Sequence, residues 1–550
     1  MKRILIFALC ACMLLTCFTG CGEKKGPSKS LEELGYQYED PAKPIVKEKG
    51  TAKYRVISQK NAMADNYNDM KVFKDLYDST YVDVNWENLS ANQYAVQKQL
   101  IMQDKKNWPD AIYHAYFSDA EIIRYATRKT FIAIDEYLEY MPNLSAILEK
   151  RPDIKKIITM PDGHFYSLPR VEEMGLMPYP NLLFLNKEWV GDLIDQGKIN
   201  FLTKADLKDG LDLTIDQMET ILRLFKNNDM NGNGKNDEIP LSFVFQNWQG
   251  NQTDLWGAFG VPDNVDHRTV IDGKVVCTAT MDGFKEATNF YADWVTEGLI
   301  DKASFEYSEE SFLASGKAPQ QKLGAFYWWE SETVVTDPEN YIVLNPLKGT
   351  DGTQMIGLSN SPEISKCLCV IFSTCENPEI LLTYFDRFYE PYTSAQIVYG
   401  PIGIVYEEEL DENGKLVQKP IPEGMTADEL RLKNAPMGVS YLSDETWENY
   451  LNMEPRAVLR LERLEKHAIP FAGNGVETLP NPSFTLEELN FLGQQYEQNV
   501  YDFIIGSLTD WLLHGGVTDA EYEQFKKDLE NLNLSGVLEA YQNGYERTKA

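Results

Sequence analysis

Two periods of apolar residues alternate along the region that follows residue 50. Three short apolar runs have the period of strands, and two stretches between them have the period of helices. In chain order these segments cover residues 54–58, 69–77, 81–86, 95–105 and 111–116. Alternating strands and helices with short connections predict a mostly parallel sheet, and such sheets bind ligands beyond the carboxyl ends of their strands. The loop after Tyr116 is therefore a candidate wall of a ligand cleft.

A second unit of the same kind follows a stretch punctuated by Pro and Gly, which ends near Pro180 and indicates a crossover between two lobes. Its predicted strands and helices cover residues 181–185, 187–196, 214–227, 284–297, 324–329 and 341–388. Trp189 and Trp294 lie on apolar helix faces, so we assign both to the core. Helices dominate the remainder of the chain.

The chain has 550 residues, 43% of them hydrophobic, and is long enough to bury a large core. Its 52 Lys and Arg stand against 84 Asp and Glu, a formal net charge of -32 at pH 7. A surface of that sign repels nucleic-acid backbones and anionic lipids. Composition therefore excludes nucleic acid as a partner, and it excludes attachment to a membrane through a polybasic patch.

The first 21 residues have the features of a bacterial lipoprotein leader. A short positive start precedes residues 4–18, which are apolar except for one threonine and too few for a membrane span of about 20 residues. The closing segment Phe18–Cys21 resembles a lipobox, in which the cysteine is acylated and becomes the N-terminus. We expect a signal peptide at 1–20 and a lipid-anchored flexible tether at 21–50, with acyl chains such as palmitate at Cys21. The protein would then sit on the extracellular face of the cytoplasmic membrane of a Gram-positive cell. The alternative is that Cys21 is only one more cysteine of an apolar leader.

The cysteines and histidines do not predict a metal site. Four cysteines remain beyond Cys21, too few for a disulfide framework in a chain of this size, and five histidines are scattered singly. Cys367 and Cys369 lie in one apolar run, where strand alternation puts both thiols on the same face. We expect buried thiols there, and zinc chemistry is not supported.

Residues 227–240 carry the most specific internal motif. Oxygen donors alternate along it, and Gly234 permits a sharp turn, as calcium loops require. The predicted ligands are Asp229, Asn231, Asn233, the carbonyl of Lys235, Asp237 and Glu238. The loop begins as an EF-hand does, but its twelfth position is Pro240 and no second helix follows, so we expect a structural calcium ion and no switch. Magnesium fits less well because it keeps more water. The alternative is a metal-free surface turn.

Aromatic residues make up 12% of the chain. Sugar rings present apolar faces with a rim of hydroxyls, so a sugar site needs flat aromatic platforms beside polar groups. The candidates are Trp328, Trp329 and Glu330, Trp248, Trp256, and Tyr166 with Arg170. Adjacent strand residues point to opposite faces, so at most one of Trp328 and Trp329 is a platform. For each candidate, packing in the core is at least as good an explanation.

Motifs of catalysis are absent from the sequence. It contains no Gly-x-Ser-x-Gly elbow, no His-Glu-x-x-His, no phosphate loop and no dinucleotide fingerprint. Nothing singles out a carboxylate pair of the kind that glycosidases use. These absences favour a binding protein over an enzyme.

Together these motifs resemble the extracellular solute-binding lipoproteins of carbohydrate ABC importers, family 1, in the subfamily of alginate and oligosaccharide binders. Besides Cys21, the segments that carry the resemblance are Asp162–Pro169, Leu183–Trp189, Phe225–Pro240, Asp272–Lys274, Glu297–Asp301 and Gly536–Arg547. The resemblance implies an α/β, two-lobe, type II periplasmic-binding-protein fold with a hinge, a central ligand cleft and a helix-rich C-terminal part. It places the calcium loop in the second lobe, and a tryptophan of segment 324–329 on sugar, with Trp256 as a second candidate.

From the resemblance and the element pattern we expect lobe I at residues 51–165 and 340–390, and lobe II at 166–339 and 391–550. The implied protein is a monomer that is not an enzyme, and its partners are an oligosaccharide or other sugar and the membrane permease. The acidic composition favours a neutral or basic ligand, although Arg170 could reverse that preference. Two other functions stay open: a surface enzyme that acts on glycans, and a glycan sensor or adhesin without a transport role.

Overall fold

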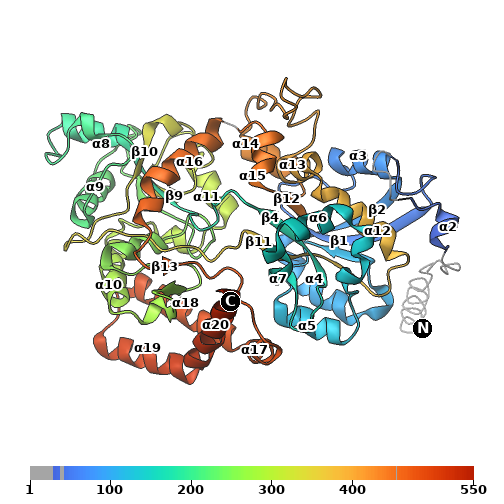
Figure 1. Cartoon of the computed structure of the whole chain (residues 1–550). Coiled ribbons are helices and arrows are strands. Elements are labelled where there is room, and N and C mark those ends of the chain that lie inside the picture. Colours follow the sequence, from blue (N-terminus) through green and yellow to red (C-terminus); the bar gives the residue numbers. More distant parts are fainter. Residues whose placement is uncertain (1–28, 38–42, 454, 550) are drawn as a thin grey trace, which may run out of the picture.

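The computed structural model describes residues 29–37, 43–453 and 455–549. Two bodies lie side by side in Figure 1, and each contains its own β-structure. We call them the first lobe and the second lobe. The first contains a six-stranded sheet in the order β12-β4-β11-β3-β1-β2, and the second contains a four-stranded sheet, β10-β5-β9-β6, and a three-stranded sheet, β13-β7-β8. The expected α/β fold with two lobes is confirmed.

The strands of the first lobe are β1 (Ala52–Lys60), β2 (Val82–Ser90), β3 (Ala111–Tyr113), β4 (Ser167–Glu172), β11 (Ile364–Ile371) and β12 (Ser440–Leu442). Its helices are α2 (Leu31–Leu34), α3 (Lys71–Thr80), α4 (Ala91–Gln103), α5 (Asp119–Thr127), α6 (Pro142–Lys150), α7 (Pro152–Ile158), α12 (Pro378–Asp386), α13 (Pro391–Tyr399), α14 (Ala427–Asn434) and α15 (Asp444–Asn449).

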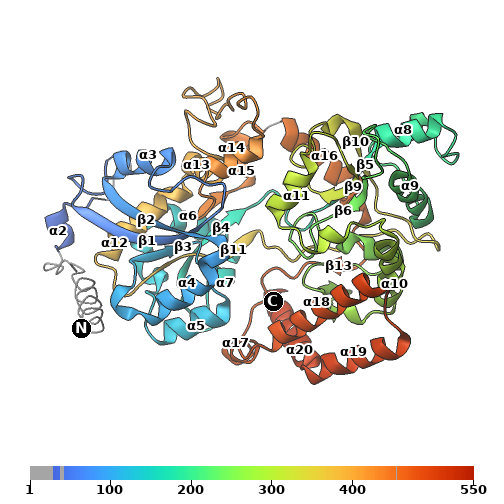
Figure 2. The same ribbon diagram turned by 180° about the vertical axis from the view of Figure 1, so that it is seen from behind.

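The strands of the second lobe are β5 (Leu182–Asn186), β6 (Ile239–Ser242), β7 (Arg268–Ile271), β8 (Lys274–Cys277), β9 (Leu323–Trp328), β10 (Tyr341–Leu344) and β13 (Val476–Glu477). Its helices are α8 (Lys187–Asp195), α9 (Ile215–Asn227), α10 (Asp282–Glu297), α11 (Glu309–Gly316), α16 (Pro455–His467), α17 (Leu486–Leu492), α18 (Tyr496–His514), α19 (Asp519–Asn531) and α20 (Leu534–Lys549). Figure 2, the reverse view, shows α18, α19 and α20 along one side of this lobe.

The parallel β1–β3 unit of the first lobe matches the predicted strand–helix alternation. β1 pairs in parallel with β2 and with β3. Val56 faces one apolar cluster and its neighbour Ile57 faces another, so both faces of the strand are buried. A strand covered on both faces needs apolar residues on each side, which explains why these segments are continuous apolar runs. The carboxyl ends of β1 and β3 consequently meet at one edge of the sheet.

The second lobe is organised by β9, which pairs with β5 on one side and β6 on the other. Thr214 is the N-cap of helix α9 and forms a capping box with Gln217, and the apolar face of the helix packs into the core of the lobe. Helix α10 ends at Gly298, whose φ of 73° is the left-handed conformation that glycine adopts easily. Trp189 and Trp294 are buried in the same cluster, as expected.

The expected lobe boundaries are wrong at three places. β4, expected in the second lobe, pairs with β11 and β12 in the sheet of the first lobe. β10, expected in the first lobe, pairs with β5 in the second. α13 and β12 contribute to the core of the first lobe, although residues 391–550 were expected in lobe II. The physical reason is that an apolar strand pattern shows burial but does not show which of two sheets the strand joins.

The expected flexible tether at residues 21–50 is also partly wrong. Ile45 and Val46 are fully buried against the first lobe, and the Ile45 N–H donates to the carbonyl of Thr80. Residues 43–50 are therefore part of the folded body. The predicted leader at 1–20 and the lipidation site Cys21 lie outside the described residues. Within the described ranges, none of the helices has the length and apolarity that crossing a bilayer requires.

Candidate functional site

A cavity of about 460 Å³ lies between the two lobes. Its walls come from β4 and the crossover after it, from α13–α15 of the first lobe, and from α11, α16 and the residues after β9 in the second. The volume falls in the range of about 300–1,000 Å³ that is usual for ligand sites. We call this the inter-lobe cavity.

The second lobe contributes an aromatic pair to this cavity. Trp329, directly after β9, and Trp248 meet edge to face, with ring centroids 6.2 Å apart and planes at 87°. The guanidinium of Arg460 from α16 lies 5.2 Å from the Trp329 ring centroid. A cation over the face of an aromatic ring attracts the ring and helps to hold it in place. The pair provides the flat surface that a sugar face requires.

The first lobe contributes a second aromatic pair that the sequence analysis missed. Tyr399 of α13 and Trp447 of α15 both line the cavity, with ring centroids 5.3 Å apart. The Tyr399 hydroxyl donates to Glu172 of β4, and Arg431 of α14 lies 5.0 Å from the Tyr399 ring centroid. Each lobe thus presents to the cavity a pair of contacting rings with an arginine beside it. No sequence signal distinguishes these rings from ordinary helix-face aromatics.

Charged side chains surround the rings in equal numbers of each sign. Four arginines and four carboxylates line the inter-lobe cavity: Arg170, Arg431, Arg456, Arg460, Glu172, Glu309, Glu330 and Asp428. They can donate to and accept from sugar hydroxyls. This local balance contrasts with the strongly acidic chain as a whole.

Burial shifts the pKa values of two of these carboxylates. Glu330 is 3% exposed and pairs with Arg456. Burial raises the pKa of Glu330 to about 7, against the opposing charges of Arg456 and Arg460. Burial, followed by the charge of Asp428, raises the pKa of Glu309 to about 7. Because α11 and α14 belong to different lobes, Glu309 and Asp428 place like charges on opposite walls.

Four of the seven predicted ligand residues line the cavity: Trp248, Trp329, Arg170 and Glu330. The other three do not. Trp328, at the end of β9, is 1% exposed and packs against the Phe312 ring. Trp256 is also 1% exposed and packs on Phe284 and Tyr291. The Tyr166 hydroxyl donates to Asp162, outside the cavity. These three are core or local contacts, because the strand face or loop that carries each one turns it into its own lobe.

The predicted calcium loop connects α9 to β6. The two carboxylate oxygens of Asp229 accept from the N–H groups of Asn233 and Gly234, at 2.9 and 2.7 Å. Asn231 Oδ1 accepts from the same Asn233 N–H at 3.1 Å. Side chains at alternate positions therefore fold back over the loop, and Gly234 has the left-handed φ of 82° that the turn requires.

Two carboxylates close the end of the loop. Glu238 is 9% exposed, its Oε1 accepts from the N–H groups of Met230 and Asn231, and its Oε2 is buried without a hydrogen-bond partner. Lys322 Nζ donates to Asp237 Oδ2 at 2.6 Å, and this bond holds the pKa of Asp237 below its usual value. Across the described ranges, no three His, Cys, Asp or Glu side chains gather as a metal-binding group. A calcium ion here would depend on amide and carbonyl oxygens beside the carboxylates, and the orphaned Glu238 oxygen fits such an ion.

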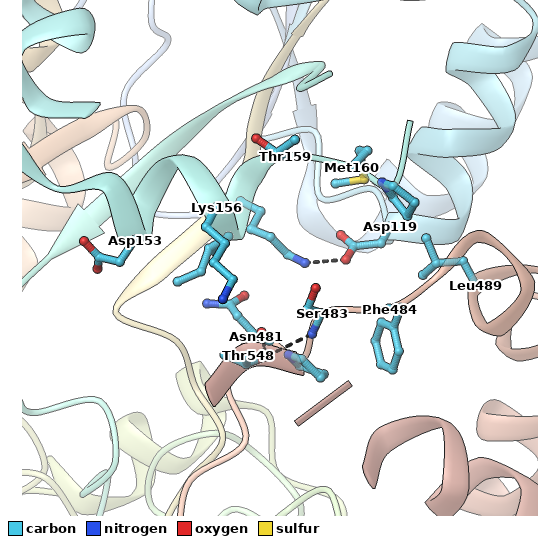
Figure 3. Close-up of a pocket in the computed structure, with 14 residues that line it drawn as sticks. Asp119, Asp153, Lys156, Thr159, Met160, Asn481, Ser483, Phe484, Leu489 and Thr548 are labelled. Atoms are coloured by element: carbon cyan, nitrogen blue, oxygen red, sulfur yellow. Dashed lines mark hydrogen bonds and ion pairs between the residues drawn. The ribbon is translucent and has the colours of Figure 1, made fainter. Parts of the chain in front are cut away.

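A second cavity, of about 140 Å³, lies between the first lobe and residues 481–484 of the C-terminal part (Figure 3). Lys366 pairs with Asp119 on its wall, and Phe484 is its one ring. Its volume is below the range of about 300 Å³ and above that is usual for ligands of drug size. The inter-lobe cavity is therefore the better candidate for a sugar site.

Comparison with known proteins identifies the family of the chain. No family model matches the chain. The chain is 30% identical over 548 residues to FusA of Streptococcus pneumoniae, a substrate-binding protein of a fructooligosaccharide ABC transporter, covering 98% of this chain and 96% of FusA. The solved structure of FusA with kestose superposes with a TM-score of 0.82 at 29% identity, covering 90% of this chain and 99% of that one.

More distant structures share the fold. An HMO-binding solute-binding protein from Bifidobacterium longum infantis has a TM-score of 0.72 at 21% identity, over 90% of this chain and 99% of that chain. The alginate-binding protein AlgQ2, solved without calcium, has a TM-score of 0.67 at 17% identity, over 91% of this chain and 100% of that chain. Because the match to FusA extends over nearly the whole length of both chains, the chain belongs to the substrate-binding proteins of carbohydrate ABC transporters. This is a family of binding proteins and not of enzymes.

Proposed function

We propose that this protein captures a neutral oligosaccharide in the inter-lobe cavity and delivers it to a membrane permease. The observation that carries the proposal is the pair of rings on each wall, Trp248 with Trp329 and Tyr399 with Trp447. Rings from two lobes can hold opposite sides of a sugar chain only when the lobes are close together. Binding and lobe closure are therefore one event in this proposal.

The charge balance of the cavity supports a neutral ligand. Four arginines and four carboxylates leave no large surplus of charge that would select a sugar acid or an amino sugar. Fructooligosaccharides are the first ligands to test, because FusA carries that name and its structures include kestose and fructo-nystose.

Calorimetric titration tests this proposal. We expect heat with kestose or nystose, and none with a uronate oligosaccharide of similar length. Chromatography of the titrated sugar should show no new product. A protein that gives no heat with any neutral oligosaccharide would contradict the proposal, and accumulation of shorter sugars would support the alternative of a glycan-active enzyme.

We also propose that residues 229–238 bind a structural calcium ion. Asp229, Asn231, Asn233, Asp237 and Glu238 would hold it with the carbonyl of Lys235, and the buried free oxygen of Glu238 supports this assignment. The ion would supply charge neutralisation and rigidity to the connection between α9 and β6. The names of related structures agree, since a FusA EF-hand mutant and a calcium-free AlgQ2 have been solved.

Lipid attachment at Cys21 and a position on the outer face of the cytoplasmic membrane are proposals that rest on the sequence alone. So is the expectation that the protein acts as a monomer beside its permease. Fractionation of cells expressing the wild type and Cys21→Ser tests the anchor. We expect the wild type in the membrane fraction and the variant outside it; equal membrane retention of both would contradict the assignment.

A further inference from the structure

Three bulky residues with left-handed backbone gather at the carboxyl end of β3. His114, Tyr116 and Met437 have φ angles of 56°, 44° and 55°. Residues other than glycine rarely adopt this backbone conformation, and where they do the surrounding structure must hold them in it. Such positions concentrate at binding sites.

A buried network holds this strained turn. The ring of His114, which is 5% exposed, lies 2.9 Å from the carbonyl of Gln59 through Nδ1 and 2.8 Å from the carbonyl of Met437 through Nε2. The Tyr116 N–H donates to the carbonyl of Cys367 at 2.9 Å, and Lys98 donates to the Tyr116 carbonyl at the same distance. The backbone is therefore fixed from the sheet below and from α4.

The side chain of Tyr116 is stacked and yet exposed. Its ring lies parallel to the His114 ring, with centroids 5.8 Å apart and planes at 7°. At 53% exposure it is the one aromatic residue classed as exposed in the part of the chain that the structure describes. One face of the ring packs on His114, but the rest of this large ring is open to solvent on a strained backbone, and a ligand explains that exposure better than packing does.

The turn that carries Tyr116 borders the inter-lobe cavity. Met437, whose carbonyl contacts His114, and Arg170 both line the inter-lobe cavity. Surrounding protein raises the pKa of the Tyr116 phenol, and the positive charge of Arg170 opposes that shift. The carboxyl ends of parallel strands are where such sheets bind ligands.

We propose that Tyr116 is an additional sugar-stacking platform, which extends the inter-lobe site along the first lobe and sets the length of oligosaccharide that the protein prefers. This assignment rests on the proposed function. The two ring pairs of the inter-lobe cavity hold one part of the oligosaccharide. The face of the Tyr116 ring that points away from His114 holds a further sugar unit. Longer ligands therefore gain a contact that short ligands do not reach.

The test uses substitutions that separate binding from folding. Asparagine adopts the left-handed conformation more readily than tyrosine, so Tyr116→Asn removes the ring while relieving the backbone. We expect Tyr116→Asn to unfold at the same temperature as the wild type or higher, and to bind the tetrasaccharide nystose about tenfold more weakly, as loss of one ring contact implies. Sucrose affinity should change less than twofold. Tyr116→Phe keeps the ring and should bind nystose as the wild type does.

Tyr496→Ala is the matched control, because that ring stacks on Phe491 at 4.8 Å in the C-terminal helices and does not line the cavity. It should leave nystose affinity unchanged. Nystose affinity of Tyr116→Asn within twofold of the wild type would overturn the inference while leaving the proposed function in place. A wild type that binds no oligosaccharide would overturn both.

Discussion

The proposed calcium loop gives a prediction in which one substitution has different effects with and without the ion. Glu238→Gln keeps an oxygen that accepts from Met230 and Asn231, and it replaces the buried Oε2 that has no partner. In the absence of calcium the wild type bears the cost of that buried carboxylate oxygen, about 1–3 kcal/mol for an unsatisfied group. The variant loses the charge, so without calcium it should be as stable as the wild type or more stable.

With calcium the order reverses. A ligand at about 100 times its Kd stabilises the folded state by about 2.7 kcal/mol. For a unit the size of one lobe this corresponds to a rise of about 5–10 °C in the melting temperature. Glu238→Gln removes the buried carboxylate oxygen, Oε2, that has no hydrogen-bond partner and is therefore open to the ion. We expect the variant to lose most of this rise in melting temperature.

Thermal unfolding followed by circular dichroism, in excess EGTA and in excess calcium chloride, measures both effects. Glu286→Gln is the matched control: it makes the same chemical change at an exposed position of α10, and it should respond to calcium as the wild type does. A wild type whose melting temperature is the same in EGTA and in calcium would refute the metal assignment. Full calcium stabilisation of Glu238→Gln would refute the role given to that carboxylate.

Three further predictions concern the site and the fold. Trp329→Ala should weaken sugar binding about 5- to 30-fold in calorimetric titration, since a ring face lost from the ligand is worth about 1–2 kcal/mol, whereas Trp256→Phe should lower the melting temperature without changing affinity. Gly438→Ala places a Cβ 1.9 Å from a buried tyrosine hydroxyl and should destabilise the protein by about 2 kcal/mol or more in urea unfolding, whereas Gly506→Ala, in open space on α18, should stabilise it by about 0.5–1 kcal/mol. The raised pKa of Glu309, about 7, means that the folded state holds a proton that the unfolded state has released above about 4.5, so ligand-free stability should fall by about 1–3 kcal/mol as pH rises from 4.5 through 7. Urea unfolding at a series of pH values checks this, and a Glu309→Gln variant with the same slope as the wild type would contradict it.

The sequence predicts most of the local structure because periodicity and capping are local signals. The alternation around β1–β3 and the helix expected over residues 214–227 are present, and Thr214 is the N-cap of that helix, α9. The fold class followed from such elements together with the family resemblance. Assignment of strands to lobes failed for β4 and β10, since each is an apolar strand next to a crossover and either sheet would bury it.

Side-chain direction is the part that the sequence could not supply. Cys367 and Cys369 were expected on one face, but a register shift between Ser365 and Cys369 puts them in different apolar clusters. The same limit applies to Trp328 and Trp329, where the end of β9 decides which ring meets the cavity.

The rings of the first lobe show a further limit. Tyr399 lies on α13, whose packing depends on α14 and β12 further along the chain, and Trp447 lies on the short helix α15 that follows β12. Their exposure to the cavity is a property of the assembled lobe, and the helical pattern alone is that of core residues.

A crystal structure of the protein grown with nystose tests the central claim most directly. The account predicts sugar between the two lobes, with one ring stacked on Trp329 and another unit near Tyr399 and Trp447. Sugar bound elsewhere on the surface, or an inter-lobe cavity filled by the protein's own side chains at saturating nystose, would contradict it.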